Sequence, residues 1–277
     1  MDLLSLAQSY GPFVVAMAFA GVVGGLLAGL LGVGGGIVIV PVLFSTLGTL
    51  GISDDLAIKV AVATSLATIV VTSVSSARSH YKCGTVDLDL LRAWGPWIVV
   101  GVFLGTVLAN LAKGWVMTLV FGIVALLVAI NMILRAHNGA LRADFPSTTI
   151  KNGSATFVGA FSAIMGIGGG TLSVPILTAF GFDIKRSVGT AAAIGFLIAV
   201  PATLGYIIGG WSAPDRPPFS IGYVNLIAFM ALVPLTTLCA PLGARLAHAL
   251  PGHILSYAFA VFLLLTSARM LWSVWAN

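Results

Sequence analysis

The sequence predicts an all-α polytopic membrane protein built from two homologous halves. Three observations carry this prediction: an apolar composition, a series of long apolar runs, and a set of sequence anchors that occurs twice in the same order. Apolar residues make up 59% of the 277 residues and charged residues only 8%, whereas a soluble domain carries about a quarter charged residues. Several runs approach or exceed the roughly 20 apolar residues that cross a bilayer. We therefore expect a multi-pass protein of the bacterial cytoplasmic (inner) membrane, with the lipid bilayer as its surroundings.

A glycine cluster is the clearest anchor of the internal repeat. Gly32-Val33-Gly34-Gly35-Gly36, closed by Pro41, recurs as Gly166-Ile167-Gly168-Gly169-Gly170, closed by Pro175, at an offset of 134 residues (175 − 41). Two further anchors follow in the same order: Ile58-Lys59 with Thr64 matches Ile184-Lys185 with Thr190 at an offset of 126, and Gly84-Thr85-Val86-Asp87 matches Gly222-Tyr223-Val224-Asn225 at an offset of 138. We interpret this ordered set as a duplication. It predicts a first transmembrane repeat over residues 1–135, a polar linker over 136–152 and a second repeat over 153–277.

Each half divides into five expected helical segments. They run over 12–31, 36–50, 56–77, 90–111 and 115–135 in the first half, and over 153–167, 170–181, 187–209, 222–246 and 252–274 in the second. The second segment of each half is short for a span, which is typical of a half-helix or a re-entrant element. An irregular loop over 209–218 has no equally long counterpart in the first half.

The basic residues predict the orientation. If all ten segments cross, Lys and Arg divide nine to four between the two sides; if each glycine break only interrupts one span, so that eight segments cross, they divide eight to five. The ten-segment arrangement is better polarised, and five segments per half predict an inverted repeat with both termini outside. The net charge of +5 follows from this bias, and no basic stretch is interleaved with aromatic residues, so we expect no nucleic-acid partner.

The glycine motifs are candidate anion sites. A helix that begins just after Gly34-Gly35-Gly36 presents unpaired backbone N–H groups and the positive end of its dipole, without any charged side chain. The absence of Cβ atoms lets a ligand approach the backbone, and Pro41 in the following segment would free another carbonyl or bend the helix. The alternative is close helix–helix packing through small residues.

Polar side chains near the repeat anchors are candidate ligands for the same anion. Thr64, Ser65 and Thr190 could donate to its oxygens, although hydroxyls in membrane helices commonly bond to the backbone of their own helix or to a neighbour. Arg78, His80 and Lys82 could form a positive mouth that concentrates anions, or serve as ordinary flanking charges. The predicted substrate-binding residues are Gly34, Gly35, Gly36, Pro41, Thr64, Ser65, His80, Gly168, Gly169, Gly170, Pro175 and Thr190.

Several functional classes are disfavoured. The chain contains no glutamate, and its eight aspartates fall in loops or at segment ends, so a carboxylate relay near the midplane is not expected. We find no Walker motif, no nucleophile elbow and no metal-ligand spacing. Cys83 and Cys239 suggest neither a disulfide framework nor a metal site. We expect neither an enzyme nor a bound cofactor.

The repeated Gly-[Val/Ile]-Gly-Gly-Gly-x-[Val/Leu]-x-Val-Pro motif resembles that of the TauE/SafE family of membrane anion exporters, also called the sulfite exporter family. The likeness continues through Ala63-Thr64-Ser65-Leu66, through Gly189-Thr190-Ala191, and through His80 with the following Gly84-Thr85-Val86-Asp87. Two departures from symmetry are Ala191 where the first half has Ser65, and Asn225 where it has Asp87.

This resemblance implies a duplicated helical transporter of sulfite, sulfonates such as sulfoacetate, or related small anions. We therefore expect an exporter in which the two glycine motifs meet near the pseudo-symmetry axis and bind the anion between them. The alternatives left open are an anion channel, a membrane scaffold or assembly factor that moves no substrate, and a homodimer in place of a monomer.

Overall fold

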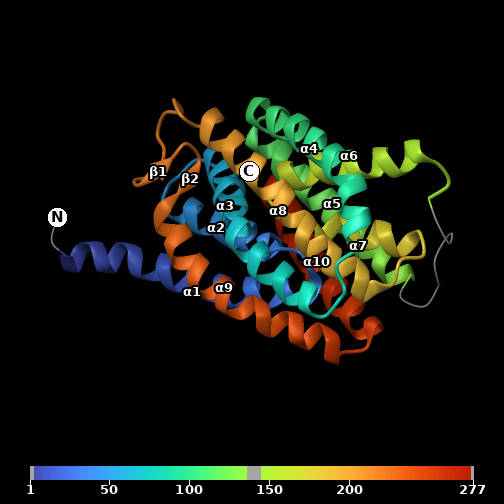
Figure 1. The fold of residues 1–277 in the computed structure, drawn as a ribbon. Coiled ribbons are helices and arrows are strands. Elements are labelled where there is room, and N and C mark those ends of the chain that lie inside the picture. The colour runs from blue at the N-terminus through green and yellow to red at the C-terminus, as the bar shows by residue number, and fades with distance from the viewer. Residues whose placement is uncertain (1–2, 136–144, 276–277) are drawn as a thin grey trace.

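The computed structural model describes residues 3–135 and 145–275, and side chains from residue 11 onward with a few exceptions near the C-terminus. Within these ranges the chain forms ten helices and one short hairpin (Figure 1). The first half contains α1 (Leu3–Leu31), α2 (Gly36–Thr49), α3 (Asp54–Lys82), α4 (Leu88–Leu111) and α5 (Gly114–Arg135). The second half contains α6 (Thr148–Met165), α7 (Gly170–Ala179), α8 (Ile184–Gly209), β1 (Ser220–Ile221), β2 (Val224–Asn225), α9 (Leu226–Ala249) and α10 (Gly252–Trp275).

The all-α membrane fold is confirmed. By length and composition, six helices in the described ranges could cross a bilayer: α1, α3, α4, α5, α8 and α9. The two short segments are also helical: α2 has 14 residues and α7 has 10. At about 1.5 Å per residue these reach about 21 and 15 Å, against a hydrocarbon core about 30 Å thick. Both are too short to cross that core.

Several boundaries differ from the expected ones. Helix α1 begins at Leu3 rather than at residue 12, and α3 continues to Lys82 rather than ending at residue 77. The segment expected from residue 222 begins at Leu226, because the chain first forms the β1–β2 hairpin, in which Gly222 has a positive φ of 56°. Asn225 then caps α9, since its side chain accepts a hydrogen bond from the Ala228 N–H at 2.9 Å. Helix α6 starts at Thr148, inside the expected linker, where the Ser147 hydroxyl caps it. The rest of the linker, 136–144, lies outside the described residues.

Helix α3 is the centre of the molecule. In its most apolar stretch of 18 residues, 83% of the residues are buried inside the molecule. The corresponding share is 28–50% in the other five long helices. It packs against α8 and α9 from the second half and against α2 from its own half. Apolar side chains on the outer helices, such as Phe103 and Leu127, are largely exposed, as expected for surfaces that face lipid.

The helices pair across the two halves in a regular way. Helix α1 lies along α9, and α4 lies along α6 at the other side of the molecule (Figure 1). Helices α3 and α8 also pair, as do α5 and α10. The first helix of each half therefore contacts the fourth helix of the other half. The two third helices contact each other, and so do the two fifth helices.

Close contacts at glycines give the relative directions of these pairs. Gly21 packs against Leu235 and Gly29 against Ala240, so α1 and α9 run parallel. The α4–α6 pair is parallel too, because Gly101 meets Thr156 and Gly105 meets Ala160.

The central pair runs the other way. Gly195 of α8 lies beside Ser73 of α3, whereas Gly189, closer to the start of α8, lies beside Thr85 beyond the end of α3. Helices α3 and α8 are therefore antiparallel.

Candidate functional site

The two glycine motifs are in direct backbone contact. The Gly168 N–H donates a hydrogen bond to the Val33 carbonyl at 2.9 Å. A Cβ atom on Gly34 would lie 3.4 Å from the Gly168 Cα, and one on Gly170 would lie 2.6 Å from the Gly32 carbonyl oxygen. Segments 134 residues apart in the sequence thus meet at one place.

This contact lies at mid-depth of the helix bundle. The Cβ of a residue at position 34 would also touch Ile69, which is at the midpoint of α3, and that of a residue at position 169 would touch Ile194, near the middle of α8. Both breaks are therefore level with the centres of two long helices, rather than at a surface of the molecule.

Glycine is required here by conformation as well as by space. The φ angles of Gly34 and Gly35 are 76° and 81°, in the left-handed region that favours glycine. A Cβ on Gly35 would lie 2.7 Å from the Gly24 carbonyl oxygen, and one on Gly36 would collide with the Gly166 carbonyl oxygen. The glycines consequently provide close packing, and the same geometry places the starts of α2 and α7 beside each other.

The starts of both short helices have unpaired donors. In the described chain the backbone N–H groups of Gly36, Ile37, Gly170 and Thr171 have no backbone acceptor. Helix α2 begins at Gly36 and α7 at Gly170, so the positive ends of two helix dipoles converge on the motif contact. Such a pair of N-termini can hold an anion.

Two buried hydroxyls that we did not predict lie in the first turn of α7. Thr171 and Ser173 are both 0% exposed, and neither hydroxyl has a hydrogen-bond partner among the described residues. Leaving a buried polar group unpaired costs about 1–3 kcal/mol. At the offset of 134 these positions correspond to Ile37 and Ile39, so a comparison of the two motifs could have singled them out as polar in one half alone.

The predicted hydroxyls all have protein partners. The Ser65 hydroxyl donates to the Gly166 carbonyl at 2.7 Å and so lies at the motif contact. The Thr64 hydroxyl accepts from the Asn225 N–H at 2.9 Å. The Thr190 hydroxyl accepts from the Asp87 N–H at 2.9 Å and donates to its own helix. The hydroxyls of Thr64 and Thr190 thus bond to the first residues of α9 and α4, and their role in binding substrate stays a prediction.

The two prolines lie on the short helices, inside the bundle. Pro41 and Pro175 are buried within α2 and α7. Their carbonyls accept hydrogen bonds from Ser45 at 2.8 Å and from Thr178 at 3.2 Å, respectively. Their role in binding substrate stays a prediction.

His80 lies apart from the two cations beside it in sequence. It is 1% exposed, and its Nε2 lies 2.9 Å from the Gly29 carbonyl oxygen, which ties the end of α3 to α1. Arg78 and Lys82 are exposed and line an open groove with Arg245. The structure therefore does not bring His80 into a positive mouth with them.

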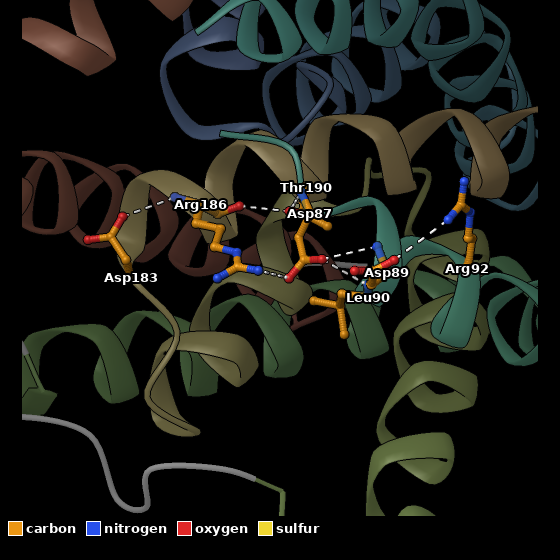
Figure 2. Close-up of polar contacts among 7 residues, drawn as sticks. All are labelled: Asp87, Asp89, Leu90, Arg92, Asp183, Arg186 and Thr190. Atoms are coloured by element: carbon orange, nitrogen blue, oxygen red, sulfur yellow. Dashed lines mark hydrogen bonds and ion pairs between the residues drawn. The ribbon is translucent and has the colours of Figure 1, made fainter. Parts of the chain in front are cut away.

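A charged junction closes one end of the α4–α8 contact (Figure 2). Asp87 caps α4 by accepting from the N–H groups of Asp89 and Leu90 at 3.1 and 3.0 Å. Its other carboxylate oxygen lies 2.7 Å from the Arg186 guanidinium, and its side chain is only 7% exposed. Asp87, Arg186 and Thr190 together connect the start of α4 to the start of α8.

The equivalent junction of the other half is neutral. Asn225 caps α9, and its N–H is bonded to Thr64 in the way that the Asp87 N–H is bonded to Thr190. The Asn225 amide donates to Pro218 and Ser220 of the neighbouring loop, with no ion pair. Burial, and beyond it the charge of Asp55, raises the pKa of Tyr223 in this hairpin, so its hydroxyl stays protonated.

The described residues contain no group of three His, Cys, Asp or Glu side chains that could hold a metal ion. The two cysteines are free thiols, Cys83 exposed and Cys239 half-buried.

Comparisons with known proteins agree on one class. A family model described as sulfite exporter TauE/SafE matches residues 17–270. A probable membrane transporter protein of Haemophilus influenzae is 32% identical over 260 residues, covering 93% of this chain and 98% of that protein. The probable membrane transporter YunE of Bacillus subtilis is 28% identical, with 93% and 97% covered. One from Methanocaldococcus jannaschii is also 28% identical, with 79% and 81% covered. No solved structure matches the chain.

Proposed function

The chain belongs to the sulfite exporter TauE/SafE family, and we propose that it is a secondary transporter that exports small anions, such as sulfite, sulfoacetate or other organosulfonates, across the cytoplasmic membrane. The family and the relatives establish a multi-pass membrane transporter. The choice of an anion rests on the chemistry of the motif contact.

The convergence of two helix N-termini at mid-depth is the observation that carries the proposal. The free N–H groups of Gly36 and Gly170 favour negative charge, and the unpaired hydroxyls of Thr171 and Ser173 supply further donors. The oxygens of a sulfite or sulfonate group accept several hydrogen bonds at once. The described aspartates lie at helix ends or in loops, and the carboxylate of Asp87 is paired with Arg186.

An inverted repeat would give this site access from both sides in turn. We infer such a repeat because α1 and α9 run parallel, α4 and α6 run parallel, and α3 and α8 run antiparallel. These directions fit two halves with opposite orientations in the membrane. Rocking of the two halves around the glycine contact would then expose the anion alternately to each side.

The two matching cap contacts fit this motion. Thr190 binds the start of α4 near one end of α8, and Thr64 binds the start of α9 near the opposite end of the bundle. In our proposal, each closes one side of the transporter. The Asp87–Arg186 ion pair strengthens only the first of them.

The test is anion flux into proteoliposomes that contain the purified protein, measured for sulfite, thiosulfate, sulfoacetate, taurine and carboxylates. We expect saturable flux of sulfite or a sulfonate, reduced by Thr171→Val and Ser173→Ala. Thr178→Val is the matched control, because that hydroxyl lies on the same helix but bonds to the Val174 carbonyl at 2.9 Å. Fast flux that does not saturate would indicate a channel, and no flux of any anion would contradict the proposal.

These isosteric changes test the site more sharply than glycine substitutions. A β-branched residue at Gly35 or Gly169 would place its Cβ 2.7 Å from a carbonyl oxygen, of Gly24 or of Ala191. Loss of packing and loss of binding would then give the same result. The two hydroxyl substitutions separate these effects.

A further inference from the structure

A groove of about 830 Å³ lies between α3 and α9, apart from the glycine contact. It is formed by one helix from each half, and Ser75 of α3 donates across it to the Thr237 carbonyl at 3.2 Å. The groove opens to the surface of the molecule, and Val74 on its wall is 51% exposed. A ligand held there would contact both halves of the protein.

The lining changes from apolar to basic along the groove. On α3 the residues at intervals of four are Val70, Val74, Arg78 and Lys82, which lie on one face of the helix. On α9, which runs in the same direction as α1, Pro241 is followed four residues later by Arg245. The apolar part and the basic part are offset by about 12 Å, the rise of eight helical residues.

The basic end has no acidic partner. Arg78, Lys82 and Arg245 are exposed, and among the described residues no carboxylate lies within ion-pair distance of any of them. Arg92, near the same end of α3, is by contrast paired with Asp89 at 3.6 Å. Three uncompensated cations around one opening make an anion the matching ligand.

We propose that this groove binds an anionic phospholipid, with its phosphate between Arg78, Lys82 and Arg245 and an acyl chain along Val70 and Val74. The basic residues lie at the end of the bundle that carries most of the Lys and Arg of the chain, which the charge bias assigns to the cytoplasmic leaflet. Basic pockets between membrane helices on that side suit anionic headgroups. A soluble anion would use the cations but not the half-buried Val70 or the exposed Val74, so the apolar half of the groove favours a lipid.

Thermal unfolding of the full-length protein in detergent tests this. Phosphatidylglycerol and phosphatidylcholine with the same acyl chains are added separately, and inorganic phosphate and glycerol phosphate form two further arms. We expect phosphatidylglycerol to raise the midpoint and the other three additions to leave it unchanged. Arg78→Gln, Lys82→Gln and Arg245→Gln should each weaken the lipid effect about fivefold in apparent affinity, and all three together about a hundredfold.

Two further variants keep the result interpretable. Arg92→Gln removes an exposed cation at the same end and should leave lipid binding unchanged. Val74→Trp fills the apolar half of the groove without altering charge and should weaken phosphatidylglycerol binding. This variant tests the proposal even if the triple variant does not fold. Equal stabilisation by the two lipids, an unaltered response of the triple variant, or an equal shift with glycerol phosphate would each overturn the proposal.

Discussion

The substitution Asp87→Asn isolates the single charged feature that distinguishes the two cap junctions. Asparagine caps helices as well as aspartate does, and the other half already has Asn225 at the equivalent position. The change should therefore keep the cap on α4 and remove only the ion pair with Arg186.

The expected magnitude follows from burial. The Arg186 side chain is 58% exposed and that of Asp87 is 7% exposed. Solvent therefore screens the charge of Arg186 but hardly that of Asp87. An exposed pair contributes about 0–1 kcal/mol and a hydrogen bond to a charged group about 1.5–3 kcal/mol. We expect the loss of the ion pair to lower the free energy of unfolding by about 2 kcal/mol. For a chain of this size, this loss lowers the midpoint of thermal unfolding by about 4–8 °C.

The same change should alter access to the site. If the junction closes one side of the transporter, a loss of about 2 kcal/mol shifts the ratio of closed to open forms about thirtyfold. We would measure maleimide labelling of a cysteine introduced at Val188, which is 2% exposed, after replacing Cys83 and Cys239 by serine. Labelling should be faster in Asp87→Asn.

Asp89→Asn is the control, because Asp89 and Arg92 are 95% and 79% exposed. It should lower the free energy of unfolding by no more than about 1 kcal/mol and leave the labelling rate unchanged. If Asp87→Asn behaves like Asp89→Asn in both assays, the pair is not a closing contact and the reasoning is refuted.

Two other predictions concern packing and the repeat. Thr64→Val and Thr190→Val each leave the N–H of a buried capping residue unpaired, so each should lower the free energy of unfolding by about 1–3 kcal/mol; very unequal losses in thermal unfolding would count against equivalent junctions. Gly36→Ala should prevent accumulation of folded protein, because the new Cβ collides with backbone, whereas Gly48→Ala, with open space at its Cβ, should be tolerated. Size-exclusion chromatography of the two variants measures the difference. A folded Gly36→Ala protein would contradict the packing described for the glycine contact.

Most of the fold could be predicted because it depends on local pattern. Hydropathy and the breaks at glycine located all ten helices, most of them within a few residues of their observed ends. The error at residue 222 arose because the apolar character of Tyr223 and Val224 continues into α9, although the backbone there turns at Gly222. Hydrophobicity alone does not separate a buried hairpin from the first turn of a helix.

The site was less predictable because its contacts are long-range. The repeated motif directed attention to the two glycine clusters, which lie in contact. The partners of Thr64 and Thr190 lie elsewhere in the sequence and leave no local signal. The Asp87–Arg186 pair joins residues about a hundred positions apart. The place of Arg245 beside Arg78 and Lys82 likewise follows only from the packing of α9 on α3.

The concentration dependence of sulfite and sulfonate flux in proteoliposomes tests the central claim most directly, with Thr171→Val/Ser173→Ala compared against wild type and Thr178→Val. A hydrogen bond to a charged group contributes about 1.5–3 kcal/mol, so each lost hydroxyl should weaken apparent affinity about tenfold or more, while the control keeps wild-type kinetics. Saturable flux that is lost in the double variant but retained in the control is the predicted result. Wild-type kinetics in a folded double variant would contradict an anion site at the start of α7.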